Sequence, residues 1–299
     1  MNQFFSFLLK NSIAGLLGVC LLWQYSPAQE TAPKIEWQKS LGGGDWDIAN
    51  SIAQTSDGGY IVAGWSSSND GDVSGNHGEG DYWIVKLTSG GELAWQKSLG
   101  GSDKDIANSI AQADDGGYVV AGWSQSTNGD VTGNHGLSDA WIVKLTSEGE
   151  LVWQKSLGAN GWDEANSIQQ TSDGGYIVAG SSLSTDGDVT GHHGSVDSTD
   201  SWIVKLTSGG ELAWQKSLGG KHHDRTDSIA QISDGEYIIA GLSSSKDGDA
   251  SSIAQTADGG YIVAGVSYSN DGNATGNHIA IHYTDFWIVK LAPSNSTGR

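Results

Sequence analysis

Cysteine is almost absent from this 299-residue sequence, and its single occurrence, Cys20, lies in a segment with the features of a secretory signal peptide. Lys10 supplies a positive charge, residues 13–23 form an apolar run, and the small residues Ser26 and Ala28 precede a suitable cleavage site. Cleavage after Ala28 leaves a chain without cysteine, which excludes disulfides, thiol chemistry and cysteine-ligated zinc.

Long apolar runs are also lacking, because nothing after this segment approaches the ~20 consecutive apolar residues of a membrane-spanning helix. We therefore expect residues 1–28 to be a signal peptide and the mature chain, from Gln29, to be secreted or held at the cell surface without membrane insertion. The alternative is a lipoprotein anchored at Cys20, since the apolar run ends in LGVC, although Val19 fits poorly before a lipidated cysteine.

Positive charge is scarce, since 15 Lys and Arg residues stand against 35 Asp and Glu, for a formal net charge of −20. So acidic a surface repels phosphate backbones and anionic lipid headgroups, which argues against nucleic acid and membranes as partners. It is compatible with divalent cations and neutral ligands.

What the sequence does contain is an internal repeat. The stretch WQKSL begins at Trp37, Trp95, Trp153 and Trp214, at intervals of 58, 58 and 61 residues. Each unit holds four short segments rich in apolar and β-branched residues, joined in pairs by SDGG and SGGE or close variants, which favour tight hairpins.

No segment between these turns has a helical apolar period. Four antiparallel strands in each unit, repeated along the chain, predict an all-β fold: a β-propeller of about four to five four-stranded blades. A β-solenoid or a row of small sandwiches is the competing architecture.

Two irregularities bear on the closure of the propeller, predicted to span residues 29–291 and to be followed by a tail at 292–299. The repeats start with a WQKSL strand at Trp37 and stop after FWIVKL at Leu291, so the N- and C-terminal strands are expected to complete one shared blade and leave no unpaired edge. Directly after Asp249, 34 residues carrying two strands are missing relative to the other units, which predicts one incomplete blade.

The unit WQKSLGG…SIAQTSDGGYIVAG…DYWIVKL resembles repeats of bacterial exported and cell-surface proteins with predicted β-propeller folds, many of them cargo of the type IX secretion route. The resemblance covers nearly the whole mature chain, from Trp37 to Leu291. It implies a propeller outside the cell, and some members are loosely labelled endoglucanase. This sequence departs from the type IX pattern, because only APSNSTGR follows Leu291 where many members carry a sorting domain.

The tryptophans fall into two groups. Eight recur at fixed places in the unit, where a large aromatic in every blade is expected to pack the core: Trp37, Trp83, Trp95, Trp141, Trp153, Trp202, Trp214 and Trp287. Four others stand where the remaining units carry different residues, which makes them candidate ligand-binding platforms, with packing as the alternative: Trp46, Trp65, Trp123 and Trp162.

The loop sequence NDGDVSGNHG, residues 69–78, recurs in later units. Oxygen ligands at alternate positions of a glycine-bent loop suit calcium, so the candidate metal ligands are Asp70, Asp72, Asp130, Asp186, Asp188, Asp247, Asp249 and Asp271. Asp and Asn beside Gly are also the ordinary residues of tight turns, so loop closure without a metal is the alternative. The histidines of this loop would better suit a transition metal: His77, His135, His193 and His278.

A further aspartate precedes the SI strand of the units: Asp47, Asp105, Asp163 and Asp224. One carboxylate per blade could line a central channel, but the simpler role is to bond backbone amides and fix a turn.

The sequence contains no Gly-x-Ser-x-Gly, His-Glu-x-x-His or phosphate-binding motif. A glycosidase needs two carboxyl groups with different protonation, and identical blades provide identical environments. Catalytic residues are therefore expected where the repeat breaks: Glu79, Lys104, Glu148, Glu164, Asp197, Asp200, KHHDRTD at 221–227, Glu236 and HIAIH at 278–282.

Together these patterns predict an exported propeller that binds or scaffolds a glycan or an extracellular protein, with calcium as a candidate cofactor. A carbohydrate-active enzyme and a purely structural surface repeat are the alternatives.

Overall fold

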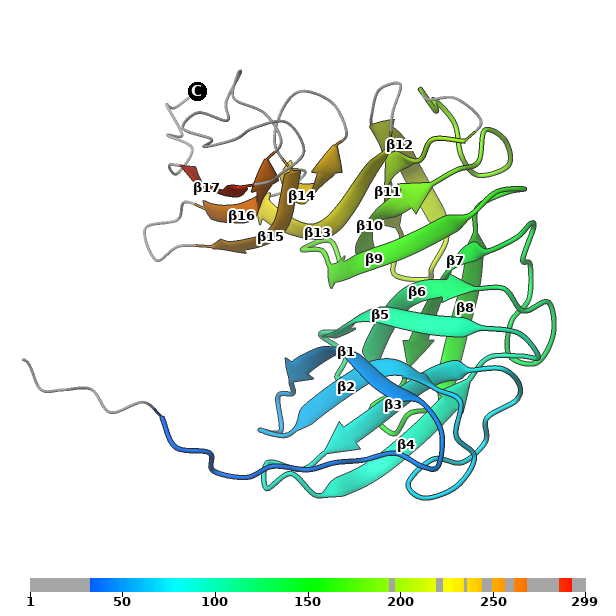
Figure 1. The fold of residues 1–299 in the computed structure, drawn as a ribbon, viewed down its shortest axis with the longest axis vertical. Coiled ribbons are helices and arrows are strands. Elements are labelled where there is room, and N and C mark those ends of the chain that lie inside the picture. Colours follow the sequence, from blue (N-terminus) through cyan, green and yellow to red (C-terminus); the bar gives the residue numbers. More distant parts are fainter. Residues whose placement is uncertain are drawn as a thin grey trace, which may run out of the picture. The chain divides into compact units, whose positions relative to one another are not determined.

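The computed structural model describes residues 33–193, 197–218, 223–233, 236–243, 249–255, 261–267 and 285–291. The chain divides into two units, Met1–Glu36 and Trp37–Arg299, and every strand belongs to the second (Figure 1). Within the described ranges the chain forms strands and turns, and no helix there is long and apolar enough to cross a membrane. The predicted signal peptide, 1–28, and tail, 292–299, lie outside these ranges.

Three complete sheets follow one another along the chain, each an antiparallel meander of four strands. The first blade comprises β1(Asp47–Gln54), β2(Tyr60–Ser66), β3(Asp81–Leu87) and β4(Leu93–Leu99). The second comprises β5(Asp105–Gln112), β6(Tyr118–Ser124), β7(Asp139–Leu145) and β8(Leu151–Leu157). The third comprises β9(Asp163–Gln170), β10(Tyr176–Ser182), β11(Asp200–Leu206) and β12(Leu212–Leu218).

Two smaller sheets complete the described strands. β13(Asp224–Ser233) and β14(Glu236–Ser243) form a two-stranded sheet, and β15(Asp249–Gln255), β16(Tyr261–Ser267) and β17(Asp285–Leu291) form the last sheet. The two-stranded sheet is the incomplete blade, and it lies directly before Asp249, as the 34-residue gap in the repeat predicts. Repeated four-stranded antiparallel sheets packed in series are the blades of a β-propeller, so the predicted fold is confirmed.

The sequence SDGG forms the predicted hairpin. In the first blade Thr55 N donates to Gly59 O at 2.9 Å, and Gly58 N donates to Thr55 O at 2.8 Å. Gly58 has a φ of 81°, which a residue without a Cβ adopts at little cost. Gly59 N donates to the carboxylate of Asp57, so the aspartate fixes the turn.

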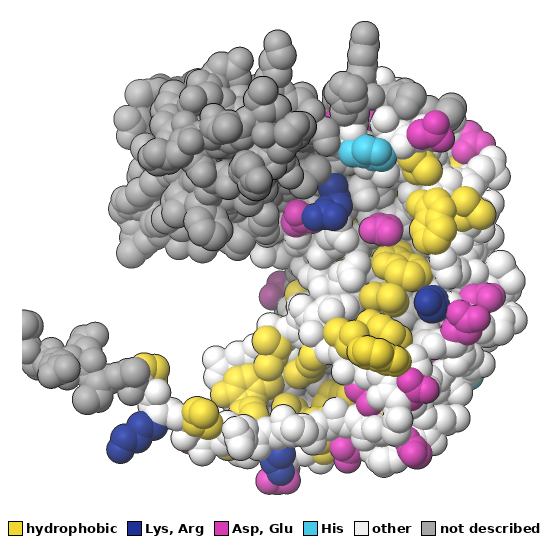
Figure 2. All heavy atoms as spheres, in the orientation of Figure 1, with side chains coloured by type: hydrophobic (Ala, Val, Ile, Leu, Met, Phe, Trp, Pro, Cys, Tyr) yellow, Lys and Arg dark blue, Asp and Glu magenta, His cyan; other side chains and the backbone are white. Residues whose placement is uncertain are grey.

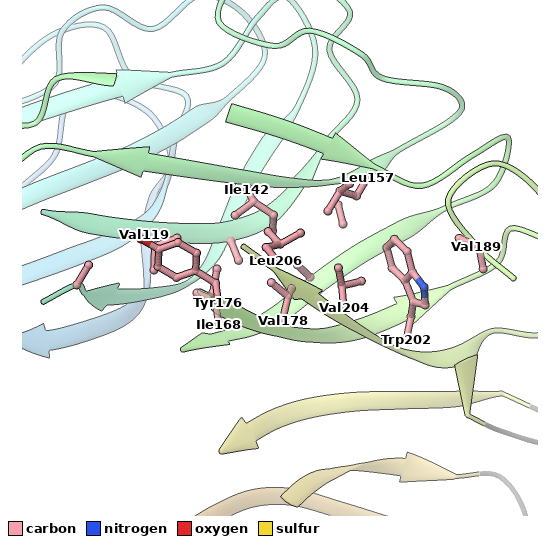
Figure 3. Packing of buried hydrophobic residues seen from close by; sticks show 14 residues of the cluster. Val119, Ile142, Leu157, Ile168, Tyr176, Val178, Val189, Trp202, Val204 and Leu206 are labelled. Atoms are coloured by element: carbon pink, nitrogen blue, oxygen red, sulfur yellow. The ribbon is translucent and has the colours of Figure 1, made fainter. Parts of the chain in front are cut away.

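The core lies between successive blades. Figure 3 shows Ile142 and Leu157 of the second blade with Val178, Trp202 and Val204 of the third, all buried and all in one cluster. An equivalent cluster joins the first blade to the second. Because each blade buries one face against the next, the junction is the repeated unit of stability.

The recurring tryptophans of the described part pack at these junctions, as predicted, except that Trp214 is 41 % exposed. Trp83, Trp141 and Trp202 in the third strands are 7 %, 0 % and 2 % exposed, and each indole N–H donates to a glutamine of the adjacent fourth strand. Those in the fourth strands pack against a tyrosine of the next sheet, with ring centroids 5.8 to 6.0 Å apart: Trp95 on Tyr118, Trp153 on Tyr176 and Trp214 on Tyr237. The side chain of Trp287 lies outside the described part.

The first strands link neighbouring blades through a β-bulge. The bulge in β5 falls at Asn108, whose amide donates to Ala165 O of β9 at 3.0 Å. Asn50 and Asn166 donate in the same way, to Ala107 O and Thr226 O. The extra residue leaves the ladder and supplies a hydrogen bond to the next sheet.

The N-terminal segment Trp37–Leu41 packs on the first blade in the way that the fourth strand of one blade packs on the next blade. Trp37 packs on Tyr60 with ring centroids 5.6 Å apart, and Leu41 joins the cluster around Trp83. The segment is not assigned as a strand, and among the described strands β17 pairs with β16. Closure of the propeller by pairing of this segment with β17 therefore stays a prediction.

Candidate functional site

Most candidate residues of the described part lie at one edge of the blades, which we call the loop edge. The first and third strands begin there, and it is formed by the loops between second and third strands and by the connections from one blade to the next. The SDGG and SGGE hairpins lie at the opposite edge, because strand direction alternates. Figure 2 shows hydrophobic side chains among acidic ones on the described surface in view.

The second aspartate of each DGD loop docks that loop onto the preceding blade connection. Asp130 N donates to Gly100 O at 2.9 Å, and Gly100 N donates to Asp130 Oδ2 at 3.3 Å. Asp72 repeats this pair with Gly42, and Asp188 repeats it with Gly158. These carboxylates therefore have a structural role in closing the loop.

At the first position of the DGD loop the side chain acts as a hydrogen-bond acceptor, and a negative charge is not required. Asp70 Oδ1 accepts from Gly44 N at 2.7 Å, and Asn128 Oδ1 accepts from Ser102 N at 2.8 Å in the equivalent place. Asp186 Oδ2 accepts from the amide of Asn160 at 2.6 Å. Asparagine therefore serves as the hydrogen-bond acceptor at this position as well as aspartate does.

Calcium binding by these loops stays a prediction. In the described ranges no three His, Cys, Asp or Glu side chains are arranged to hold a metal ion. Asp247 and Asp271 lie outside those ranges, and Asp249 begins β15 with its side chain outside them.

In each of the three complete blades the loop histidine pairs with the aspartate that begins the third strand, while His278 lies outside the described residues. His77 Nδ1 lies 2.5 Å from Asp81 Oδ2, His135 Nδ1 lies 2.7 Å from Asp139 Oδ2, and His193 Nδ1 lies 2.9 Å from Asp200 Oδ2. The third loop is three residues longer and keeps the same contact. Sequence reasoning missed these pairs, although the constant His-to-Asp spacing in the first two units was a signal for them.

The aspartates that begin the first strands fix the blade connection, which confirms the simpler of their two predicted roles. Asp105 Oδ2 accepts from Gly101 N at 2.8 Å and from Ser126 Oγ at 2.9 Å. Asp47 and Asp163 accept from Gly43 N and Ala159 N in the same way. Burial raises the pKa of Asp105 to about 6, since the charged form is poorly solvated there.

The four candidate ligand-binding tryptophans occupy two kinds of position. Trp46 and Trp162 directly precede β1 and β9 at the loop edge and are 69 % and 39 % exposed. Trp65 and Trp123 lie in β2 and β6 and are half-buried, and a carbon added to Gly80 would stand 3.0 Å from the ring of Trp65. The structure therefore divides the four into two exposed and two half-buried side chains, and ligand binding by them stays a prediction.

One group of symmetry-breaking residues comes together at the loop edge. Glu164 of β9 interacts with Arg225 of β13, and Arg225 Nε donates to Asp227 Oδ1 at 2.7 Å. Burial raises the pKa of Glu164, while Arg225 acts against that rise. Thr199 N donates to His223 Nδ1 at 3.2 Å in the same region. We call Glu164, Arg225 and Asp227 the charged cluster.

Glu148, Asp200 and Lys104 lie at other places in the described part. Glu148 lies in a hairpin at the opposite edge, where it accepts from Ser147 Oγ. Asp200 belongs to the repeated His–Asp pairs, and Lys104 takes the place before β5 that Trp46 and Trp162 take before β1 and β9. Residues 219–222 and 278–282 lie outside the described part.

Comparison with known proteins gives weak likenesses. No family model matches the chain. Over 163 residues it is 29 % identical to the regulatory protein FlaEY of Caulobacter vibrioides, a match that covers 52 % of this chain and 17 % of FlaEY. The chain thus spans less than a fifth of that relative's length.

Two solved structures are similar in part. A protein of unknown function from Bacteroides caccae is 13 % identical with a TM-score of 0.42, over 74 % of this chain and 71 % of that one. An N-acetylgalactosamine deacetylase from F. plautii, in complex with blood group B trisaccharide, is 10 % identical with a TM-score of 0.36, over 80 % and 70 %. The propeller fold of this chain rests on its own sheet topology, register and repeated junctions.

Proposed function

We propose that this chain is an extracellular propeller module that binds a glycan or a protein through its loop edge. The observation that carries the proposal is the exposure of Trp46 and Trp162, at 69 % and 39 %, at the same place in two blades. Large aromatic side chains are normally buried, and an exposed pair at one edge supplies flat apolar surface for a sugar ring or a partner side chain.

The charged cluster beside Trp162 supports a polar but uncharged ligand. Glu164, Arg225 and Asp227 together offer donors and acceptors for hydroxyl groups, while their summed charge is negative. A chain with a net charge of −20 repels anionic polysaccharides. Neutral glycans are therefore the first ligands to test.

The test is a screen of the full-length chain against an array of neutral and acidic glycans and against envelope proteins. We expect Trp46→Ala and Trp162→Ala each to weaken binding by at least about tenfold, as loss of an exposed aromatic contact does. The matched control is Val152→Ala, which trims a side chain of the outer strand β8 that is 55 % exposed. Binding that survives both tryptophan substitutions would place the ligand elsewhere.

Hydrolysis of a glycan is the second candidate, favoured by one observation. Burial raises the pKa of Glu164, as a general acid requires, and Asp227 lies beside Arg225 in the same cluster. A reducing-sugar assay over a polysaccharide panel tests this function, with Glu164→Gln as the variant. Release of sugar that Glu164→Gln abolishes would establish it, and no release at high protein concentration would end it.

A further inference from the structure

A buried carboxylate oxygen without a hydrogen-bond partner recurs in all three complete blades. Asp81, Asp139 and Asp200 begin the third strands and are 0 % exposed. In each, Oδ2 contacts the loop histidine, whereas Oδ1 has no partner among the described atoms. A buried acceptor left unpaired costs free energy, so three equivalent ones call for a common occupant.

A second carboxylate from the next sheet approaches the unpartnered oxygens of Asp81 and Asp139. Asp105 N donates to Gly80 O at 2.7 Å, which holds Asp105 beside Asp81. A carbon added to Gly100 would overlap Asp105 Oδ2 and stand 2.8 Å from Asp81 Oδ1. The two carboxylates therefore face the same small space.

The third blade repeats this cradle. A carbon added to Gly158 would overlap Asp163 Oδ2 and stand 3.0 Å from Asp139 Oδ1. At the next junction Asp224 N donates to Thr199 O at 2.7 Å, which brings Asp224 beside Asp200. Glycine is required at Gly100 and Gly158, since any side chain there would collide with the adjacent carboxylates.

Negative charge dominates the cradle at the junction of the first and second blades. Asp130 Oδ2 lies 3.3 Å from Gly100 N, so a third carboxylate stands near Asp81 and Asp105. Among the ion pairs of the described residues, the cationic partner of Asp81 is His77 alone. Several buried carboxylates with one weak base beside them require a proton or a cation for neutralisation.

We propose that these three junctions bind divalent cations with oxygen ligands, calcium being the probe, between Asp81 and Asp105, Asp139 and Asp163, and Asp200 and Asp224. The unpartnered Oδ1 supplies one ligand and the carboxylate of the next sheet supplies another. Backbone oxygens and water complete the shell, since no three acidic or histidine side chains in the described ranges converge on one point. The histidine orients the first carboxylate through Oδ2.

The proposal differs from the sequence prediction, which gave calcium to the DGD loop itself. Asp70 and Asp186 already accept hydrogen bonds, and Asn128 replaces them in the second blade, whereas an aspartate stands at the third-strand position in every complete blade. A negative charge is therefore present in every complete blade at the start of the third strand, where the buried Oδ1 lacks a hydrogen-bond partner.

The test compares thermal unfolding of the full-length chain in calcium and in chelator, together with bound calcium by equilibrium dialysis. We expect the midpoint to rise by roughly 5 °C or more when free calcium is ~100 times Kd, and about three ions to bind per chain. Asp139→Asn is expected to remove one bound ion and reduce the rise. The matched control, Asp186→Asn, is expected to change neither, because asparagine occupies that loop position naturally.

Asp139→Asn keeps the shape of the side chain. Bound calcium is measured only on protein whose circular dichroism spectrum is native, which separates loss of a site from loss of the fold. Calcium binding lost in Asp186→Asn but kept in Asp139→Asn would overturn the proposal in favour of the DGD loop. No response to calcium or magnesium would also overturn it. A midpoint in chelator that falls as the pH rises through about 6 would then show that the carboxylates hold a proton, because raised pKa values stabilise only below that pH.

Discussion

At the residue scale, the glycine of the AG pair in every second strand has a packing requirement. A carbon added to Gly122 would overlap Ile106 O of β5 and stand 2.6 Å from the hydroxyl of Tyr82. Gly122→Ala is therefore expected to destabilise the chain by about 2–3 kcal/mol, because the backbone of β5 must move. Urea unfolding followed by tryptophan fluorescence measures the change.

Gly133→Ala is the matched control for this prediction. Gly133 has a φ of 80°, and no atom lies within 4 Å of an added carbon. Alanine there has a strained left-handed backbone but overlaps no neighbouring atom, so the substitution is expected to cost about 1 kcal/mol. Equal losses for the two substitutions would show that chain flexibility, and not the contact with Ile106, explains the AG pair.

Single residues also mark the limit of what the sequence could predict. The structural role of Asp105 followed from its repetition, but the contact between His135 and Asp139 did not, because a spacing of four residues in a loop fixes no geometry. Trp46 and Trp65 look alike in sequence, and only their places in the fold, before β1 and within β2, decide that the first is exposed and the second half-buried.

At the element scale, a buried lysine ties the first hairpin of each blade to its third strand. Lys86, Lys144 and Lys205 are 6 %, 4 % and 6 % exposed, and their ammonium groups lie 2.7 to 3.0 Å from the aspartates of the SDGG and DDGG turns, Asp57, Asp115 and Asp173. Hydrogen bonds from Thr171, Gly175 and Lys205 lower the pKa of Asp173 to about 2. The pKa values of Asp57 and Asp115 are lowered as well.

These pairs predict acid sensitivity of known sign. A carboxyl with a lowered folded-state pKa stabilises the fold above its unfolded pKa, near 3.8, and this contribution is lost as the pH falls toward about 2. The free energy of unfolding of the native chain is expected to fall more steeply between pH 4 and pH 2 than that of Asp173→Asn. Urea titrations at several pH values measure both slopes, and parallel curves would contradict the prediction.

The strands themselves were predictable because their signals are local. A short run of apolar and β-branched residues next to the SDGG turn places β2 and its hairpin directly on the sequence. The bulge at Asn108 was not predictable, since its reason is a hydrogen bond to Ala165 in the next blade, 57 residues away. The sequence of a single repeat does not contain the contacts that the repeat makes with its neighbours, so these contacts could not be predicted from it.

At the scale of the whole molecule, the first blade has a bare face. Ile52 is 62 % exposed, whereas its equivalents Ile110, Ile168 and Ile229 are 5 %, 2 % and 1 % exposed. A groove of about 570 Å³ runs along this face, bordered by Trp37, Ile52 and Trp83 among others. At the junctions that contain Ile110, Ile168 and Ile229, the second and third strands of the preceding sheet fill that place.

The last sheet carries the residues that would fill the groove. In the junction of the first and second blades these are Ile61, Ala63, Tyr82 and Ile84. The register of β16 and β17 puts Ile262, Ala264, Phe286 and Ile288 at the same four places. The register of β3 with β4 then predicts how Trp37–Leu41 pairs with β17, with Gln38 opposite Val289 as Gln96 is opposite Val85.

A disulfide tests this register, because Cys20 is the single cysteine of the chain and can be replaced by serine. Gln38→Cys with Val289→Cys is expected to form an intramolecular disulfide under mild oxidation, since paired positions of antiparallel strands bring the two Cβ atoms within bonding range. Loss of free thiol and faster migration on a non-reducing gel measure it. Lys39→Cys with Val289→Cys is one residue out of register, turns the two side chains to opposite faces, and is expected to stay reduced. Crosslinked dimers would show that the last sheet of one copy covers the first blade of another, and free thiols in both variants would contradict the predicted pairing of Trp37–Leu41 with β17.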